Sequence, residues 1–226
     1  MKKLTILAIS LLFSSGVLAE AGLTIGLGYE SGEIANSDDR NGDPAGLSFM
    51  VNYSVPGTNG MFIGVDMTDN EDEADNGLPD KITTEQKRTA FEIGYRFSID
   101  DSTSISAAVS NADIEWSWED GVPANFNRFE SDDSGVSLVV GVDKQVGNGV
   151  SIGTSLSMGF ETGVEAYAAI EVVENMNVTL SYFKNSYEME WEQFDELGST
   201  GNGSAFNDGD FQFDTSGIRV SASYAF

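Results

Sequence analysis

The chain has 226 residues, with 37 acidic and 11 basic side chains, a net charge of −26, and neither cysteine nor histidine. This charge argues against nucleic acid as a partner, because phosphates would be repelled. The missing residue types exclude disulfides, thiolate metal sites and histidine acid–base catalysis. A hydrophobic content of 40% with 25 glycines is too apolar for a disordered acidic chain, so we expect one folded domain.

Residues 1–19 have the layout of a secretory signal peptide. Lys2 and Lys3 precede an apolar run over 4–17, and Val17-Leu18-Ala19 fits a cleavage site before Glu20. Cleavage after Ala21 is the second choice. A helical anchor is the alternative, but the apolar run is shorter than the roughly 18 residues that a spanning helix needs. The mature domain is then 20–226, with nine basic and 37 acidic side chains and a net charge of −28.

After the signal peptide, apolar and polar residues alternate with the period of a β-strand, and helical spacing is missing. Ten segments alternate, and the eighth is ambiguous because Tyr167 and Val173 oppose its other apolar residues. The segments are residues 23–30, 47–53, 61–67, 90–97, 105–110, 136–143, 150–160, 164–173, 176–182 and 218–226.

The last segment, Ile218 to Phe226, places Ile218, Val220, Ala222, Tyr224 and Phe226 on one face. This ending resembles the C-terminal strand of bacterial outer-membrane β-barrel proteins, of the porin-family or OmpA-like class. The resemblance implies that Tyr224 and Phe226 form the signal for the barrel assembly machinery. It also implies a signal peptide, a Gram-negative cell envelope and insertion into the outer membrane. The alternative is a soluble β-protein that ends in Phe.

The connections between the segments alternate in length. Short ones lie at 55–59, 99–102, 146–149 and 174–175, and long ones at 31–45, 69–87, 120–133 and 192–210. A short connection near 161–163 is the exception. Short turns at one end and long polar loops at the other are typical of outer-membrane barrels. We therefore predict a closed, all-β, up-and-down antiparallel transmembrane β-barrel of ten strands, with eight as the alternative, and a monomer with both termini at the periplasmic end.

Alternation alone does not decide which face meets water, since a soluble barrel would turn its apolar face inward. Here the polar face is mostly Gly, Ala, Ser and Thr, whereas its partner face is large and apolar, which favours lipid outside. Aromatic residues near both ends favour two membrane girdles. They are Tyr53, Tyr95, Phe97, Tyr224 and Phe226 beside the short turns, and Tyr29, Trp116, Trp118, Tyr187 and Trp191 beside the long loops.

The inward face carries the charged residues of a predicted lumen network. They are Asp66, Glu92, Arg96, Asp143, Glu165, Glu171 and Arg219. Buried charges must pair or be hydrated, so they either form an ion-pair network that holds the barrel closed or line a narrow passage that favours cations. Arg96 and Arg219 are the cations available for pairing. If they are fully paired, the passage is blocked.

The predicted loops are strongly acidic, and the segment 188–214 holds eight carboxylates and no basic residue. Such oxygen clusters can bind divalent cations weakly, but the run from Asp69 to Asp75 lacks the glycine of an EF-hand loop. The simpler interpretation is a solvated acidic surface, so we assign no metal site.

We expect no catalytic residues and no cofactor. Some small outer-membrane barrels are hydrolases, acyltransferases or surface proteases, but the resemblance to them carries no site here because their sites use a histidine. The only carboxylate pair that could act as acid and base is Asp66 with Glu92.

Two functions follow from these observations. The first is a structural barrel or a narrow, cation-favouring pore for ions or small solutes. The second is a surface adhesion or interaction protein with acidic extracellular loops. Lipid, lipopolysaccharide and the assembly machinery are the expected partners, with divalent cations at the loops as a further candidate.

Overall fold

The computed structural model describes residues 22–36, 42–75, 81–120, 127–189, 192–195 and 211–226. These residues form eleven β-strands, and no helix among them is long and apolar enough to span a membrane. The strands are β1 (Leu23–Asn36), β2 (Ala45–Ser54), β3 (Met61–Asp75), β4 (Lys81–Ser98), β5 (Thr103–Asp120), β6 (Asn127–Gly147), β7 (Val150–Gly159), β8 (Glu161–Val173), β9 (Met176–Met189), β10 (Glu192–Asp195) and β11 (Phe211–Ala225).

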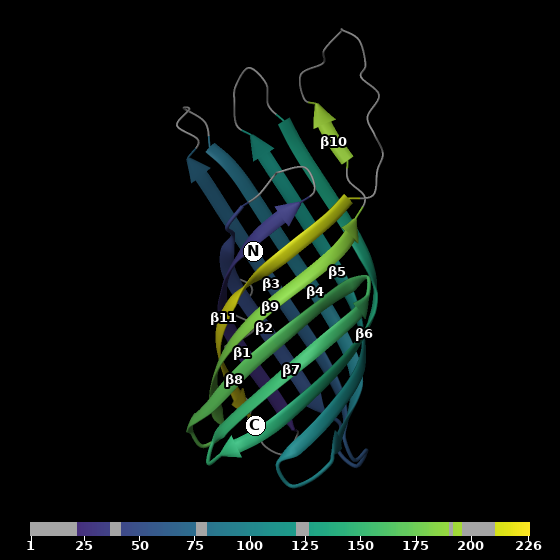
Figure 1. Cartoon of the computed structure of the whole chain (residues 1–226), viewed down its shortest axis with the longest axis vertical. Helices are drawn as coiled ribbons and strands as arrows, with labels where there is room; N and C mark the ends of the chain where they lie inside the picture. The colour runs from purple at the N-terminus through teal and green to yellow at the C-terminus, as the bar shows by residue number, and fades with distance from the viewer. Residues whose placement is uncertain (1–21, 37–41, 76–80, 121–126, 190–191, 196–210) are drawn as a thin grey trace.

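Ten of these strands close into an antiparallel barrel (Figure 1). Each strand from β1 to β9 pairs with the next, except that β9 pairs with β11, and β11 closes the ring on β1. The short β10 pairs only with the start of β6 and stands outside the ring. The prediction of ten strands in up-and-down order is confirmed. The alternative of eight is wrong, because β7 and β8 form a hairpin in which Phe160 alone separates the two strands.

Four short connections, β2–β3, β4–β5, β6–β7 and β8–β9, lie at one end of the barrel, which we call the turn end. The other end is the loop end, and the one-residue connection at Phe160 lies there. β1 begins at the turn end and β11 finishes there, since the Phe226 N–H donates to the Leu23 carbonyl (2.8 Å). Gly149 and Asn175 adopt left-handed φ angles of 72° and 65° in two of the turns, which Gly and Asn tolerate best.

The turn between β4 and β5 is held by one carboxylate. The backbone N–H and the hydroxyl of Ser102 both donate to Asp100 Oδ1, at 2.8 and 2.9 Å. These hydrogen bonds, the backbone one foremost, hold the pKa of Asp100 below its ordinary value of 3.8. The Asp100 carboxylate therefore stays ionised, and keeps accepting these hydrogen bonds, at a lower pH than an ordinary aspartate would.

The strands at the loop end are longer than the sequence predicted. β3 and β4 stay paired up to Asp75 and Lys81, and β5 and β6 up to Asp120 and Asn127, so much of the predicted loops 69–87 and 120–133 is strand. Figure 1 shows these strands rising beyond the rest of the barrel. Polar residues on both faces remove the alternation there, but ladder hydrogen bonds do not require it. The predicted loop 192–210 contains β10, and its remainder, 196–210, lies outside the described residues.

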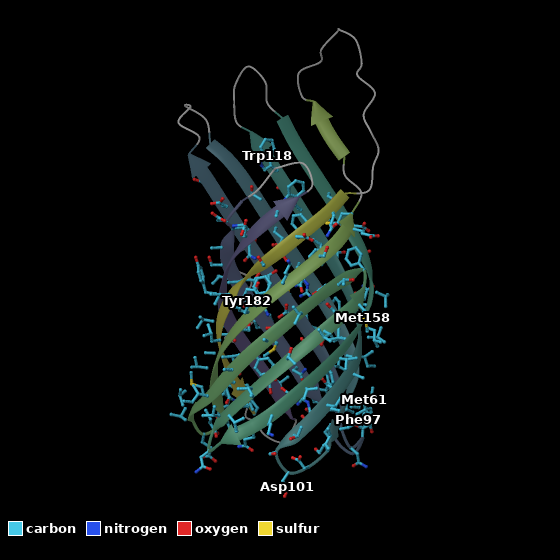
Figure 2. All side chains as sticks on the ribbon, in the orientation of Figure 1. Met61, Phe97, Asp101, Trp118, Met158 and Tyr182 are labelled. Atoms are coloured by element: carbon cyan, nitrogen blue, oxygen red, sulfur yellow. The ribbon has the colours of Figure 1, made fainter. Side chains whose placement is uncertain are left out.

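The outer face of the barrel is apolar, as predicted for a lipid-facing surface. Leu47 is 70% exposed, Val136 59% and Leu180 55%, and in Figure 2 Met158 projects from the wall. The ambiguous strand β8 follows the same rule, because Val164 and Ile170 are exposed while Tyr167 lies against Gly153 inside. Exposure of an apolar surface of this extent to water is unfavourable, whereas its contact with membrane hydrocarbon is favourable.

The predicted aromatic girdles are only partly correct. At the turn end, the rings of Tyr95 and Phe97 contact each other (5.1 Å between centroids), as do those of Tyr224 and Phe226 (4.9 Å). At the loop end, Tyr29 faces outward, but Trp116 and Tyr187 are buried in the lumen and Trp118 packs against them. The prediction failed there because these residues lie above the apolar band, where aromatic side chains fill the interior instead. Trp191 lies outside the described residues.

Candidate functional site: the barrel lumen

An apolar core fills the lumen at the loop end. Four strands, β1, β5, β9 and β11, contribute to it, and Trp118 and Phe160 pack against it. The rings of Trp116 and Tyr187 lie 5.6 and 6.0 Å from that of Phe213, measured between centroids. Its buried members are Ile34, Ile114, Trp116, Tyr187, Met189 and Phe213. Side chains from separate walls thus meet in the middle of the barrel.

On the turn-end side of this core, the side chain of Arg88 on β4 extends across the lumen. Its Nη1 lies 2.8 Å from Asp66 Oδ1, and its Nη2 lies 2.7 Å from Glu161 Oε2 on β8. The Nε atom donates to the same Glu161 oxygen at 3.0 Å. These contacts are charge-assisted hydrogen bonds, the stronger class, and they connect facing walls of the barrel.

Arg219 of β11 extends the same network on the other side. Its Nη2 lies 2.7 Å from Glu30 Oε2 and its Nη1 lies 3.7 Å from Asp66 Oδ2. Asn70 donates from Nδ2 to the second oxygen of Glu30 at 2.8 Å. Asp66 therefore links the two arginines, and three carboxylates hold two guanidinium groups in one connected layer.

Between this layer and the turn end lies a cavity of about 390 Å³. Glu92 and Glu165 line it together with several small hydroxyl residues. The hydroxyl residues include Ser110, Ser137, Ser155, Ser157, Thr179, Ser181, Ser221 and Ser223. Their small volume leaves the space open and their hydroxyl groups make it polar. In the part of the chain that the structure describes, no group of three carboxylates could hold a metal ion.

The structure divides the seven predicted network residues into three groups. Asp66 and Arg219 belong to the ion-pair layer, and Glu92 and Glu165 line the cavity. The other three lie nearer the turn end. Arg96 lies over the Phe62 ring, 5.7 Å from its centroid; Glu171 accepts the Asn175 N–H at 3.1 Å and is exposed; Asp143 is half-buried.

Sequence reasoning missed Glu30, Arg88 and Glu161. Glu30 was on the polar face of the first predicted strand but was not counted as a lumen charge. Arg88 and Glu161 fell outside the predicted strands, Arg88 directly after the connection 69–87 and Glu161 in the connection 161–163. Arg88 has the same parity as Glu92, and Glu161 the same parity as Glu165, so continuing the alternation would have placed both inside.

The two members of the predicted acid–base pair have different surroundings. Both carboxylate oxygens of Asp66 face guanidinium nitrogens, of Arg88 and Arg219. Oδ1 accepts a hydrogen bond from Arg88 at 2.8 Å and Oδ2 lies 3.7 Å from Arg219 Nη1, so the Asp66 carboxylate is part of the ion-pair layer, whereas Glu92 lines the cavity.

No protein-family model matches the chain, and no curated protein matches it. Solved structures do. The outer membrane protease OmpT from Escherichia coli matches with a TM-score of 0.60 and 10% identity, over 91% of this chain and 96% of that one. Neisserial surface protein A matches with a TM-score of 0.49 and 9% identity, over 91% and 97%.

The chain has the fold of bacterial outer-membrane β-barrels. This confirms the fold that the resemblance of the C-terminal strand implied. At such low identity the likeness to OmpT extends to the fold only. It brings no catalytic residue to a sequence without histidine.

Proposed function

We propose that the protein is a structural outer-membrane barrel of a Gram-negative bacterium, with a lumen that does not conduct ions. The observation that carries this proposal is the apolar core at the loop end, where Trp116, Tyr187 and Phe213 are each at most 2% exposed. An ion would have to lose its hydration shell to pass such a layer, and apolar side chains do not compensate for the lost hydration free energy.

The location in the outer membrane is supported by the fold and by the apolar outer face. A closed ring leaves no unpaired strand edge within the hydrocarbon. With the short turns facing the periplasm, the acidic strand ends and loops face outward, beside lipopolysaccharide. Export by residues 1–19, which lie outside the described residues, and assembly through Tyr224 and Phe226 belong to the same proposal.

The competing proposal is the narrow, cation-favouring pore. It gains support from the acidic cavity and the charged ion-pair layer, which water can hydrate, but the apolar core separates both from the loop end. Conductance of the purified protein in a planar lipid bilayer distinguishes the two proposals. We expect no discrete current steps from the wild type.

The matched positive control is the double variant Trp116→Ala with Phe213→Ala, which removes two facing rings of the apolar core. Each loss costs about 3–5 kcal/mol of stability, so folding must first be verified by heat-modifiable electrophoretic mobility. We expect this variant to conduct, because water can then reach the ion-pair layer. Cation-selective steps from the wild type would overturn closure and favour the pore, and Glu92→Gln with Arg96→Gln would then alter the selectivity.

A second candidate function is surface interaction, favoured by the acidic extensions of the strands at the loop end. Carboxylates of Glu85, Glu115 and Asp132 surround one outward groove with Lys87. Such a surface suits a basic partner or bridging cations. Binding of the protein to immobilised lysine-rich peptide, compared with the variant Glu115→Gln plus Asp132→Asn, tests this; an unchanged affinity would exclude the groove.

A further inference from the structure

The charges around the lumen cavity do not balance. Five acidic and two basic side chains line it, which is an excess of three acidic side chains. Arg88 and Arg219 are both engaged by Glu30, Asp66 and Glu161. Unbalanced charge inside a barrel wall is costly and calls for a counter-charge.

The unbalanced pair repeats the geometry of a balanced one. Arg88 on β4 meets Glu161 on β8 across the lumen at 2.7 Å. Glu92 and Glu165 lie on the same two strands, each four residues nearer the turn end. They form the next layer down, but both members are acidic, and neither carboxylate has an ion pair or a hydrogen bond with the residues that the structure describes. The position that a cation holds in the upper layer has no counterpart here.

A buried hydroxyl beside this pair also lacks a partner. Ser110 of β5 is directly opposite Glu92 in the strand register, is 3% exposed and lines the cavity. Its Oγ atom makes no hydrogen bond. Buried hydroxyls are nearly always paired, so one that lines a cavity without a partner indicates a missing donor or acceptor. A ligand that carries N–H donors would satisfy both the Ser110 oxygen and the Glu92 carboxylate opposite it.

We propose that the cavity binds an aliphatic diamine or polyamine, with ammonium groups on Glu92 and Glu165 and a hydrogen bond to Ser110. An ammonium group supplies three donors and no acceptor, which matches two carboxylates and a hydroxyl. Two carboxylates on nearly opposite walls match a linear molecule charged at both ends. A volume of about 390 Å³ lies within the range of small-ligand sites, whereas a bare metal ion would need more ligands gathered at one point.

This inference goes beyond the proposed function and does not depend on a closed lumen. The cavity lining continues toward the turn end as far as Asn52 and Ser223, on the side away from the apolar core, so amine binding does not require passage of ions through the loop end. Conductance and amine binding are therefore separate measurements, and either can fail alone.

The test is calorimetric titration of the full-length folded protein with spermidine, whose three charges match the excess in the cavity. We expect saturable binding that weakens at least tenfold in the variant Glu92→Gln plus Glu165→Gln. The control variant Glu115→Gln plus Asp132→Asn makes the same change of charge on the outer surface, and it should bind as the wild type does. Ser110→Ala should weaken binding by a smaller factor, and it provides a second variant if the double one does not fold.

Three outcomes would overturn the proposal. The first is the lack of saturable binding to the wild type. The second is an equal loss in the cavity and surface variants, which would mean that spermidine is a counter-ion of the acidic exterior. The third is a cavity-dependent response to K⁺ or Mg²⁺ with none to spermidine, which would assign the site to an inorganic cation.

Discussion

At the scale of single residues, the contribution of a charged side chain to stability depends on the face of the barrel on which it lies. Lys87 and Arg88 are neighbours in sequence and point to opposite faces. Lys87 Nζ lies 3.2 Å from Glu85 Oε2 on the outer surface, with both side chains more than 40% exposed. Arg88 is mostly buried and lies between two carboxylates. Identical charges one residue apart therefore differ in their contribution to stability.

Replacing Arg88 with Met should reduce the free energy of unfolding by about 3–5 kcal/mol, because Asp66 and Glu161 lose the cation that compensates their buried charge. The matched control is Lys87→Met, which removes an exposed ion pair and should cost about 1 kcal/mol or less. Urea unfolding in lipid vesicles, followed by tryptophan fluorescence, measures both values. Equal losses in the two variants would contradict the assignment of Arg88 as the centre of the network.

Residue parity was the part of the site that could be predicted from the sequence. Period-two alternation placed Asp66, Glu92, Glu165 and Arg219 inside, where the structure has them. Their pairing could not be predicted, since Arg88 and Glu161 meet through a ring closure that joins residues 73 positions apart. An ion pair across a lumen depends on the diameter and the strand stagger of the barrel, and the local alternation of residues predicts neither of them.

At the scale of elements, strand type was predictable and strand length at the loop end was not. Within the membrane, alternation marks each strand because one face meets lipid and the other the lumen. Above the membrane both faces of β3 and β4 are polar, so the alternation disappears, while the ladder continues to Asp75 opposite Lys81. Pairing with both neighbours stabilises these segments without an apolar signal.

Amide hydrogen exchange tests this extension directly. Amides of residues 69–73 and 83–87 should exchange slowly, at rates close to those of 61–67, because they belong to one continuous ladder. Gly57 and Thr58, in the turn between β2 and β3, provide the internal reference for rapid exchange. Exchange of 69–73 as fast as that of Gly57 would mean a loop there, as the polar sequence first suggested.

At the scale of the whole molecule, the closed ring followed from alternation together with alternating connection lengths. The apolar core inside the lumen did not follow, because Trp116, Trp118 and Tyr187 fitted an aromatic girdle equally well. Aromatic residues close to a membrane boundary suit lipid headgroups or a protein interior. The distance of each residue from the apolar band determines which of these two environments it meets. That distance depends on the stagger of all the strands in the barrel.

The inverted arrangement, apolar outside and polar inside, is tested by the same substitution on adjacent residues of β6. Leu138 is 45% exposed on the outer face, between Val136 and Val140, whereas Val139 lines the acidic cavity. Leu138→Lys should lower the free energy of unfolding in lipid vesicles by about 2–4 kcal/mol, since the ammonium would enter hydrocarbon. Val139→Lys should cost much less, because its charge meets Glu92 and Glu165. If Val139→Lys were the more damaging change, the apolar face would not be the one in contact with lipid.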